Sequence, residues 1–341
     1  GANAYNVDQN PGFGTHITGM GYANASPVTP NIDGFDWNPS GNPSLFTFSN
    51  STYGWSAVPN TDTETISAQQ VYRLFVRGDR SIDIDNNSAT PTATTIRTIG
   101  SINYGSNNIT LNAATEKHNY IPNPYQAIID VKSILSASTN LNQRYYWVWD
   151  PTLSTRGAFV VVDLDVNAPL NPITGNEETS SSANRYVMPG QAFAVYSNAA
   201  NPVLAIEESH KATAQAQTQV FSDENEPEET KYVNIRLFDT ETYTNGGRPR
   251  DALAVRFKAS GNNAIDDNDA PKLMNINENL IVFDQGKLIQ IEERALPENA
   301  DEIQLLFDNK NFTEYTFDID LDCNEGELKL HFIDQYTQQT F

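Results

Sequence analysis

The chain has 341 residues, 38% of them hydrophobic, which is enough for one large globular domain or two domains of ordinary size. It carries 21 Lys and Arg against 43 Asp and Glu, and the formal net charge of −22 repels nucleic-acid phosphates and anionic lipid surfaces. The single cysteine, Cys323, excludes an internal disulfide, a thiolate zinc cluster and a CxxC redox pair. We therefore expect no nucleic-acid partner. Without a long apolar run, we also expect no membrane insertion.

Taken in chain order, short apolar runs rich in aromatic and β-branched residues alternate with clusters of Asn, Thr, Ser, Gly and Pro. This pattern predicts an all-β fold of two consecutive antiparallel β-sandwich domains, jelly-roll or Ig-like, with one or two short helices. The first domain is predicted at residues 1–221, with a long loop at 167–184. An acidic linker follows at 222–230, where "SDENEPEET" cannot form a buried strand, and the second domain occupies 231–341.

Two local patterns are specific enough to assign elements. Apolar residues at i, i+3 and i+4 spacing predict one short helix within residues 123–138, and residues 208–221 are a weaker helix candidate. In "EYTFDIDLD" at 314–322, Tyr315, Phe317, Ile319 and Leu321 alternate with polar residues. This alternation predicts a half-buried strand rather than a calcium loop made of Asp318, Asp320 and Asp322.

Catalytic motifs are absent from the sequence. The four histidines occur in unlike contexts and form no HExxH pair, and the chain contains no GxSxG. Among 43 acidic residues a pair suited to glycoside cleavage stays possible, because its separation is a property of the fold. We therefore expect this chain not to be an enzyme, with no catalytic residues.

Two binding sites can be hypothesised. In "NNAIDDNDAP" at 262–271, Asp266, Asp267 and Asp269 could ligate calcium, although Asn and Asp also favour such turns without an ion. In "RYYWVWDP" at 144–151, Trp147 and Trp149 share one face of a predicted strand and could form a platform for a glycan. The alternative for the tryptophans is burial in the core.

The triplet Arg77-Gly78-Asp79 matches an integrin-recognition sequence, but an alternating run at 72–76 leads directly into it. We expect Gly78 to form a bulge or tight bend inside a strand pair. The triplet is therefore predicted to be architectural.

Six segments occur in a characteristic order along the chain. They are "RLFVRGDRSI" (73–82), "NPYQAIIDVKSIL" (123–135), "RYYWVWDPTLSTRGAF" (144–159), "RYVMPGQAFAVYS" (185–197), "DAPKLMNINENL" (269–280) and "LIQIEERALP" (288–297). Together they resemble the β-rich region that precedes the type IX secretion sorting domain in cell-surface and secreted proteins of Bacteroidota, flavobacteria above all. Two positions depart from that pattern, Pro122 and Ala192, where glycines are usual.

This resemblance implies an extracellular protein on the bacterial cell surface, of which the chain is an internal portion that stops before a C-terminal sorting domain. It implies the type IX secretion machinery as a partner, reached through a sorting domain outside this chain. The leading hypothesis is a non-catalytic structural or adhesive module. The alternatives are a calcium- or carbohydrate-binding module, with surface glycans or other surface proteins as partners, and the carrier region of an enzyme whose catalytic domain lies outside this chain.

Overall fold

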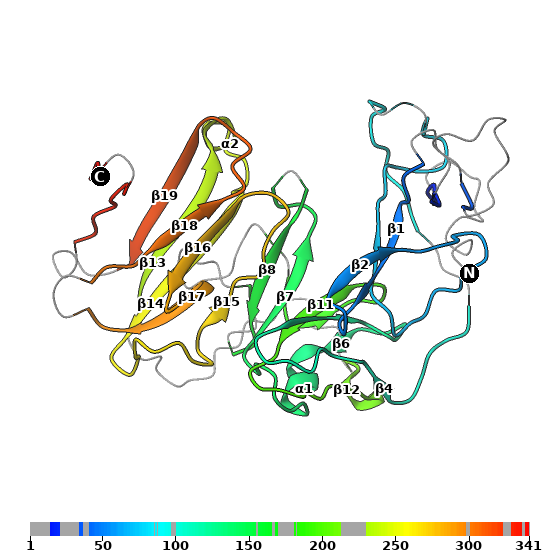
Figure 1. The fold of residues 1–341 in the computed structure, drawn as a ribbon, viewed down its shortest axis with the longest axis horizontal. Coiled ribbons are helices and arrows are strands. Elements are labelled where there is room, and N and C mark those ends of the chain that lie inside the picture. Colours follow the sequence, from blue (N-terminus) through cyan, green and yellow to red (C-terminus); the bar gives the residue numbers. More distant parts are fainter. Residues whose placement is uncertain are drawn as a thin grey trace. The chain divides into compact units, whose positions relative to one another are not determined.

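The structure is a computed structural model that describes residues 14–20, 34–36, 41–84, 86, 88–96, 100–154, 156–165, 168–169, 181, 183–212, 230–297, 301–322, 329–335 and 338–340 (Figure 1). The regular secondary structure of the described residues is mostly β-strand, with two short α-helices and one 3-10 helix. The prediction of an all-β chain with few helices is thereby confirmed.

The chain divides into two compact units, each made of two segments. The N-terminal unit comprises residues 1–141 and 187–213, and the C-terminal unit comprises 142–186 and 214–341. Almost all of the linker predicted at 222–230 and most of the loop predicted at 167–184 lie outside the described residues. The domain boundaries drawn from the sequence stay predictions.

The N-terminal unit contains a three-stranded antiparallel sheet in the order β2-β1-β3 and two further antiparallel pairs, β5 with β11 and β4 with β12. Leu45 of β1 forms a small apolar core with Ile17 and Val58, and Tyr72 and Leu74 of β3 pack against it. The elements of this unit are β1 (Leu45–Ser49), β2 (Gly54–Ala57), β3 (Tyr72–Leu74), β4 (Asn107–Asn108), β5 (His118–Pro122), β6 (Ile129–Asp130), α1 (Val131–Ser136), β11 (Ala192–Tyr196), β12 (Ala205–Ile206) and the 3-10 helix η2 (Glu208–His210). The short strand β10 (Tyr186–Val187) lies at the boundary of the two units.

Helix α1 confirms the helix predicted within residues 123–138, although it is shorter than that range. Asp130 caps its first turn, because its carboxylate accepts hydrogen bonds from the Lys132 amide at 3.1 Å and the Ser133 hydroxyl at 3.0 Å. Val131, Ile134 and Leu135 are its buried residues. Of the weaker helix candidate at 208–221, the described part contains only the single turn η2.

The Arg77-Gly78-Asp79 triplet does not lie inside a strand pair, since β3 ends at Leu74. Asp79 is buried, and its carboxylate accepts hydrogen bonds from the Ser81 amide at 3.0 Å and the Ser81 hydroxyl at 2.6 Å. At Gly78 an added Cβ would lie 2.3 Å from the hydroxyl oxygen of Thr92. The expected strand bulge is wrong, because these local contacts fold the segment into a turn; the buried Asp79 agrees with an architectural role.

The C-terminal unit is built on one sheet in the order β18-β16-β17-β14-β13-β19, with β15 paired to β17 (Figure 1). Strands β14 and β17 pair in parallel, whereas the other neighbouring strands of this sheet pair antiparallel. The prediction of purely antiparallel sheets is therefore wrong at this pair, because a crossover through β15 and β16 returns the chain in the same direction. The elements are β7 (Tyr145–Asp150), β8 (Ala158–Asp163), β9 (Ala168–Pro169), β13 (Thr230–Asp239), α2 (Thr240–Thr244), β14 (Asp251–Lys258), β15 (Ala270–Pro271), β16 (Asn279–Asp284), β17 (Lys287–Ala295), β18 (Leu305–Asp308) and β19 (Tyr315–Asp322).

One face of this sheet carries a continuous apolar core that includes Leu237, Leu253 and Leu280. Tyr315, Phe317, Ile319 and Leu321 all pack against it, which confirms the face assigned to this strand from the sequence. The ring of Phe307 on β18 lies 4.7 Å from that of Tyr315 on β19, centroid to centroid. Because these two strands are the outer strands of the sheet order, the sheet curls around its own core.

Among the residues described, no helix is long and apolar enough to cross a membrane.

Candidate functional site

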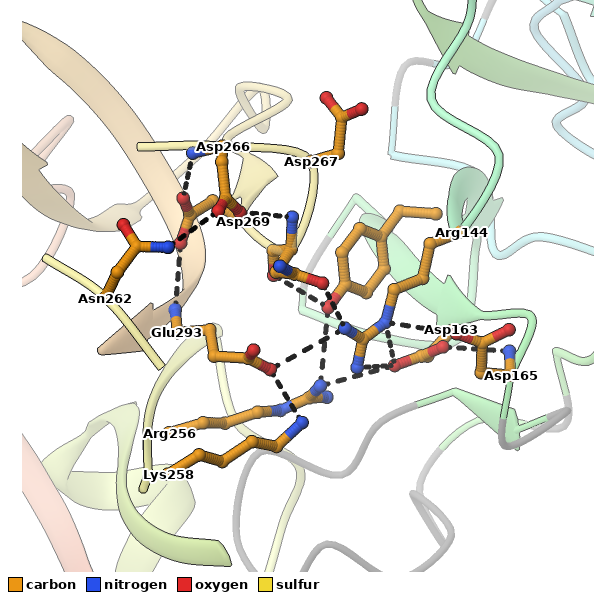
Figure 2. A network of polar contacts seen from close by, with 12 residues as sticks. Arg144, Asp163, Asp165, Arg256, Lys258, Asn262, Asp266, Asp267, Asp269 and Glu293 are labelled. Atoms are coloured by element: carbon orange, nitrogen blue, oxygen red, sulfur yellow. Dashed lines mark hydrogen bonds and ion pairs between the residues drawn. The ribbon is translucent and has the colours of Figure 1, made fainter. Parts of the chain in front are cut away.

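A polar network in the C-terminal unit gathers charged side chains from four segments (Figure 2). Strands β7 and β8 form an antiparallel hairpin in which Tyr145 is opposite Asp163, so Arg144 and Asp163 meet at one end of it. On the large sheet, Arg256 of β14 is opposite Glu293 of β17. The two pairs meet, because Arg256 Nη1 lies 3.3 Å from Asp163 and Arg144 Nη1 lies 3.6 Å from Glu293.

Asp163 is the centre of the network. Its side chain is 0% exposed, and its Oδ2 accepts hydrogen bonds from Arg144 Nε at 3.1 Å, Arg144 Nη2 at 3.0 Å and Arg256 Nη1 at 3.3 Å. Its Oδ1 accepts from the Asp165 amide at 2.9 Å. Burial alone would raise the pKa of Asp163, but the positive charges of Arg144 and Arg256 hold that pKa below its usual value. The carboxylate is therefore ionised and shared by two guanidinium groups.

Two further groups extend the network toward the large sheet. Glu293 pairs with Lys258 Nζ at 2.8 Å and lies 3.6 Å from Arg144 Nη1. The hydroxyl of Tyr145 accepts a hydrogen bond from Arg256 Nη1 at 3.3 Å and donates one to the Asn268 carbonyl at 3.1 Å. Burial raises the pKa of Tyr145, so its hydroxyl keeps the proton that this second bond needs.

The predicted calcium loop lies next to this network, but its three aspartates have different partners. Asp266 accepts hydrogen bonds from the Asn268 amide at 2.8 Å and from the Asn262 side chain at 2.8 Å. Asp269 accepts from the backbone amides of Asp266 at 2.7 Å and Glu293 at 2.8 Å. Asp267 is exposed, and its side chain points away from the other two in Figure 2. Asp266 and Asp269 thus use carboxylate oxygens to order the turn.

The pKa of Asp269 is shifted in the opposite direction to that of Asp266. Burial raises its pKa to about 6, the negative charges of Asp266 and Glu293 add to the increase, and the two amide hydrogen bonds oppose it. Asp266, in contrast, has a lowered pKa: burial would raise it, but hydrogen bonds from Asn268 and Asn262 and the charge of Arg144 outweigh burial. Within the described residues, no group of three or more His, Cys, Asp or Glu side chains is arranged to hold a metal ion.

Calcium binding by this loop stays a prediction, which thermal unfolding with and without a chelator can check. An ion bound only by the folded state raises the melting temperature by mass action, so its removal must lower it by several degrees. Asp267→Asn, which alters an exposed carboxylate of this loop, would reduce the response. Equal melting temperatures with calcium and with chelator would contradict a calcium site.

The two tryptophans of the predicted glycan platform lie on the same strand but differ in burial. Trp147 is 0% exposed, so its ring offers no surface to a sugar in this fold. Trp149 is half-buried near the end of β7, where its ring packs edge-on against Phe159 at a centroid distance of 4.9 Å. The platform stays a prediction, and of its two tryptophans only Trp149 is partly exposed to solvent.

We expect Gly157→Ala to destabilise the protein, because Trp149 occupies the space that a side chain would need. Gly157 has φ +90°, and a Cβ there would lie 2.5 Å from Cε2 of Trp149. The backbone conformation alone should cost about 1–2 kcal/mol. Urea unfolding measures the loss, with Gly54→Ala as the matched control, since a Cβ at Gly54 meets nothing within 4 Å. Equal stabilities for the two variants would contradict the packing described here.

Sequence reasoning did not find the network. Its signal was present as single charges inside apolar strand runs, Asp163 in "AFVVVDLDV" and Arg256 in "DALAVRFKA". A charged residue at a core position is rarely buried unless it is paired. That rule could have identified each residue as a member of a buried pair, but not its partner.

Comparison with protein-family models, with curated proteins and with solved structures gave no match to this chain.

Proposed function

We propose that this chain is a non-catalytic structural or adhesive module of a secreted bacterial protein, exported by the type IX secretion system and displayed on the cell surface. The two-sandwich architecture belongs to the same proposal. Its partners would be the secretion machinery, reached through a sorting domain outside this chain, and surface glycans or other surface proteins.

The observation that supports this proposal best is that the charged side chains around Asp163 are paired with one another in ion pairs. Arg144 and Arg256 pair with Asp163, while Glu293 pairs with Arg144 and Lys258. These ion pairs join a hairpin to two strands of the large sheet. Chemically, this arrangement places no nucleophile beside an activating base. The network holds together segments that lie about a hundred residues apart in the sequence. A structural module needs such contacts to keep its shape.

Localisation on intact cells tests the proposal. Antibodies raised against the purified chain should label intact cells of the source organism, and protease treatment of those cells should remove the label. In-frame deletion of these residues from the full-length gene should reduce attachment to surfaces or the display of neighbouring parts of the protein. Labelling that requires cell lysis would contradict surface display, and a deletion without effect on attachment or display would contradict the role.

The two alternatives have their own tests. A carbohydrate- or calcium-binding module should bind a glycan array or calcium as the purified chain, and Trp149→Ala should weaken glycan binding. A carrier region should leave the activity of the rest of the protein intact when that part is expressed without this chain.

A further inference from the structure

Lys272 and Asp251 form an ion pair in which neither side chain has access to water. Lys272 is 0% exposed and Asp251 is 2% exposed. The lysine Nζ lies 2.8 Å from Oδ1 and 2.6 Å from Oδ2 of the aspartate. The amine nitrogen is therefore held next to the carboxyl carbon in a single, enclosed arrangement.

The choice of lysine sets this pair apart. Three other ion pairs within the described part of the C-terminal unit have both side chains no more than 9% exposed, and they use arginine, which is the usual residue for buried pairs. They are Arg250 with Asp239, Arg256 with Asp163, and Arg294 with Glu292. Guanidinium keeps its proton in proteins, whereas a buried lysine can lose its proton and act as a nucleophile. The Lys258 and Glu293 pair also uses lysine, but its lysine is 21% exposed.

The pair is buried on the side of the sheet that carries the apolar core. Asp251 is the first residue of β14 and is opposite Leu237 of β13, so its side chain projects from the face that carries the apolar core. Burying two charges in such surroundings is costly, and their mutual attraction often fails to repay the cost. Conversion of the ion pair to a neutral amide removes both charges.

One backbone group is placed to assist that conversion. The amide of Leu280 donates a hydrogen bond to Oδ2 of Asp251 at 2.6 Å. A donor at that oxygen stabilises the negative charge that develops on it when a nucleophile adds to the carboxyl carbon, as in an oxyanion hole. Oδ1 is then the oxygen that leaves.

We propose that Lys272 and Asp251 join in an intramolecular isopeptide bond. A bond forms between Nζ of Lys272 and Cγ of Asp251, and the bond from Cγ to Oδ1 breaks. Two of the three protons of the ammonium group leave with Oδ1 as one water molecule, the third stays on the amide nitrogen, and nothing is oxidised or reduced. The bond closes residues 251–272 into a covalent ring in a chain whose only cysteine cannot supply a disulfide.

Intact-mass measurement of the purified, denatured full chain tests this directly. The wild-type chain should be lighter than its sequence mass by one water molecule, while Lys272→Met and Asp251→Ala should have their full sequence masses. Lys258→Met is the matched control, because it alters the partly exposed lysine pair and should still lack one water. Tandem mass spectrometry of a protease digest should find a branched peptide that contains both Asp251 and Lys272.

A wild-type chain at its full sequence mass would overturn the proposal, even if the variants fold poorly. A missing water that persists in Lys272→Met, or maps to other residues, would overturn it as well. The measurement uses the purified chain, so its result is independent of where the protein resides in the cell.

Discussion

Asp163→Ala is expected to destabilise the protein by about 3–5 kcal/mol, because removing one partner of a buried ion pair leaves the other charge without compensation. Here the loss affects two guanidinium groups at once, since Arg144 and Arg256 both donate to Asp163. Arg256 is 5% exposed and cannot turn to water without displacing its neighbours. The loss is measured as the change in the free energy of unfolding by urea.

Asp165→Ala is the matched control. Asp165 also faces Arg144, at 3.7 Å from Nε, but it is 65% exposed. An exposed ion pair contributes little, so this variant should lose less than about 1 kcal/mol. A similar loss in both variants would show that the cost arises from the hairpin end in general and not from the buried charges.

The stability of the protein should decrease as the pH falls, because of a buried histidine in the N-terminal unit. His118 on β5 is 7% exposed and packs edge-on against Tyr196, with ring centroids 5.0 Å apart. Burial lowers its pKa from 6.5 to about 3. Below pH 6.5 the unfolded chain therefore takes up a proton that the folded chain does not bind, and stability decreases as the pH falls. Between pH 7 and pH 5 this histidine alone should cost about 2 kcal/mol.

Urea unfolding of wild type and His118→Leu at pH 7 and pH 5 measures this contribution. The variant should lose less stability than wild type over that interval, by about the same 2 kcal/mol, whatever its stability at pH 7. His331→Gln, at an exposed position, should retain the pH dependence of wild type. Equal pH dependence in wild type and His118→Leu would contradict the burial of this histidine.

Two buried carboxyls of the C-terminal unit, Asp269 and Glu292, act in the opposite direction. Burial raises the pKa of both Asp269 and Glu292 to about 6. Between the ordinary carboxyl pKa and pH 6, the folded state holds protons that the unfolded state has released, so these groups stabilise the protein as the pH falls toward 4. The comparison with His118→Leu is therefore needed to separate the histidine from them.

The sequence by itself determined that the chain is rich in β-strands and which side of the strand at 315–322 is apolar. The alternation in Tyr315, Phe317, Ile319 and Leu321 is a property of neighbouring residues, because successive side chains of a strand point to opposite faces. The same holds for α1, whose apolar spacing and Asp130 cap lie within a few residues of each other. Local geometry gave correct predictions in both cases.

Only the tertiary structure decided which distant residues meet. Asp163 and Arg256 are 93 positions apart, Asp251 and Lys272 are 21 apart, and the parallel pairing of β14 with β17 follows a crossover. The burial of Asp79 also came from the tertiary structure, because an acidic residue fits both a surface position and a paired interior position. For Trp147 the sequence left burial and an exposed platform open, and the structure buries its side chain. Hydrophobic periodicity extends over a few residues, whereas the pairing of buried charges depends on how strands are ordered in the sheet. No local pattern records that order.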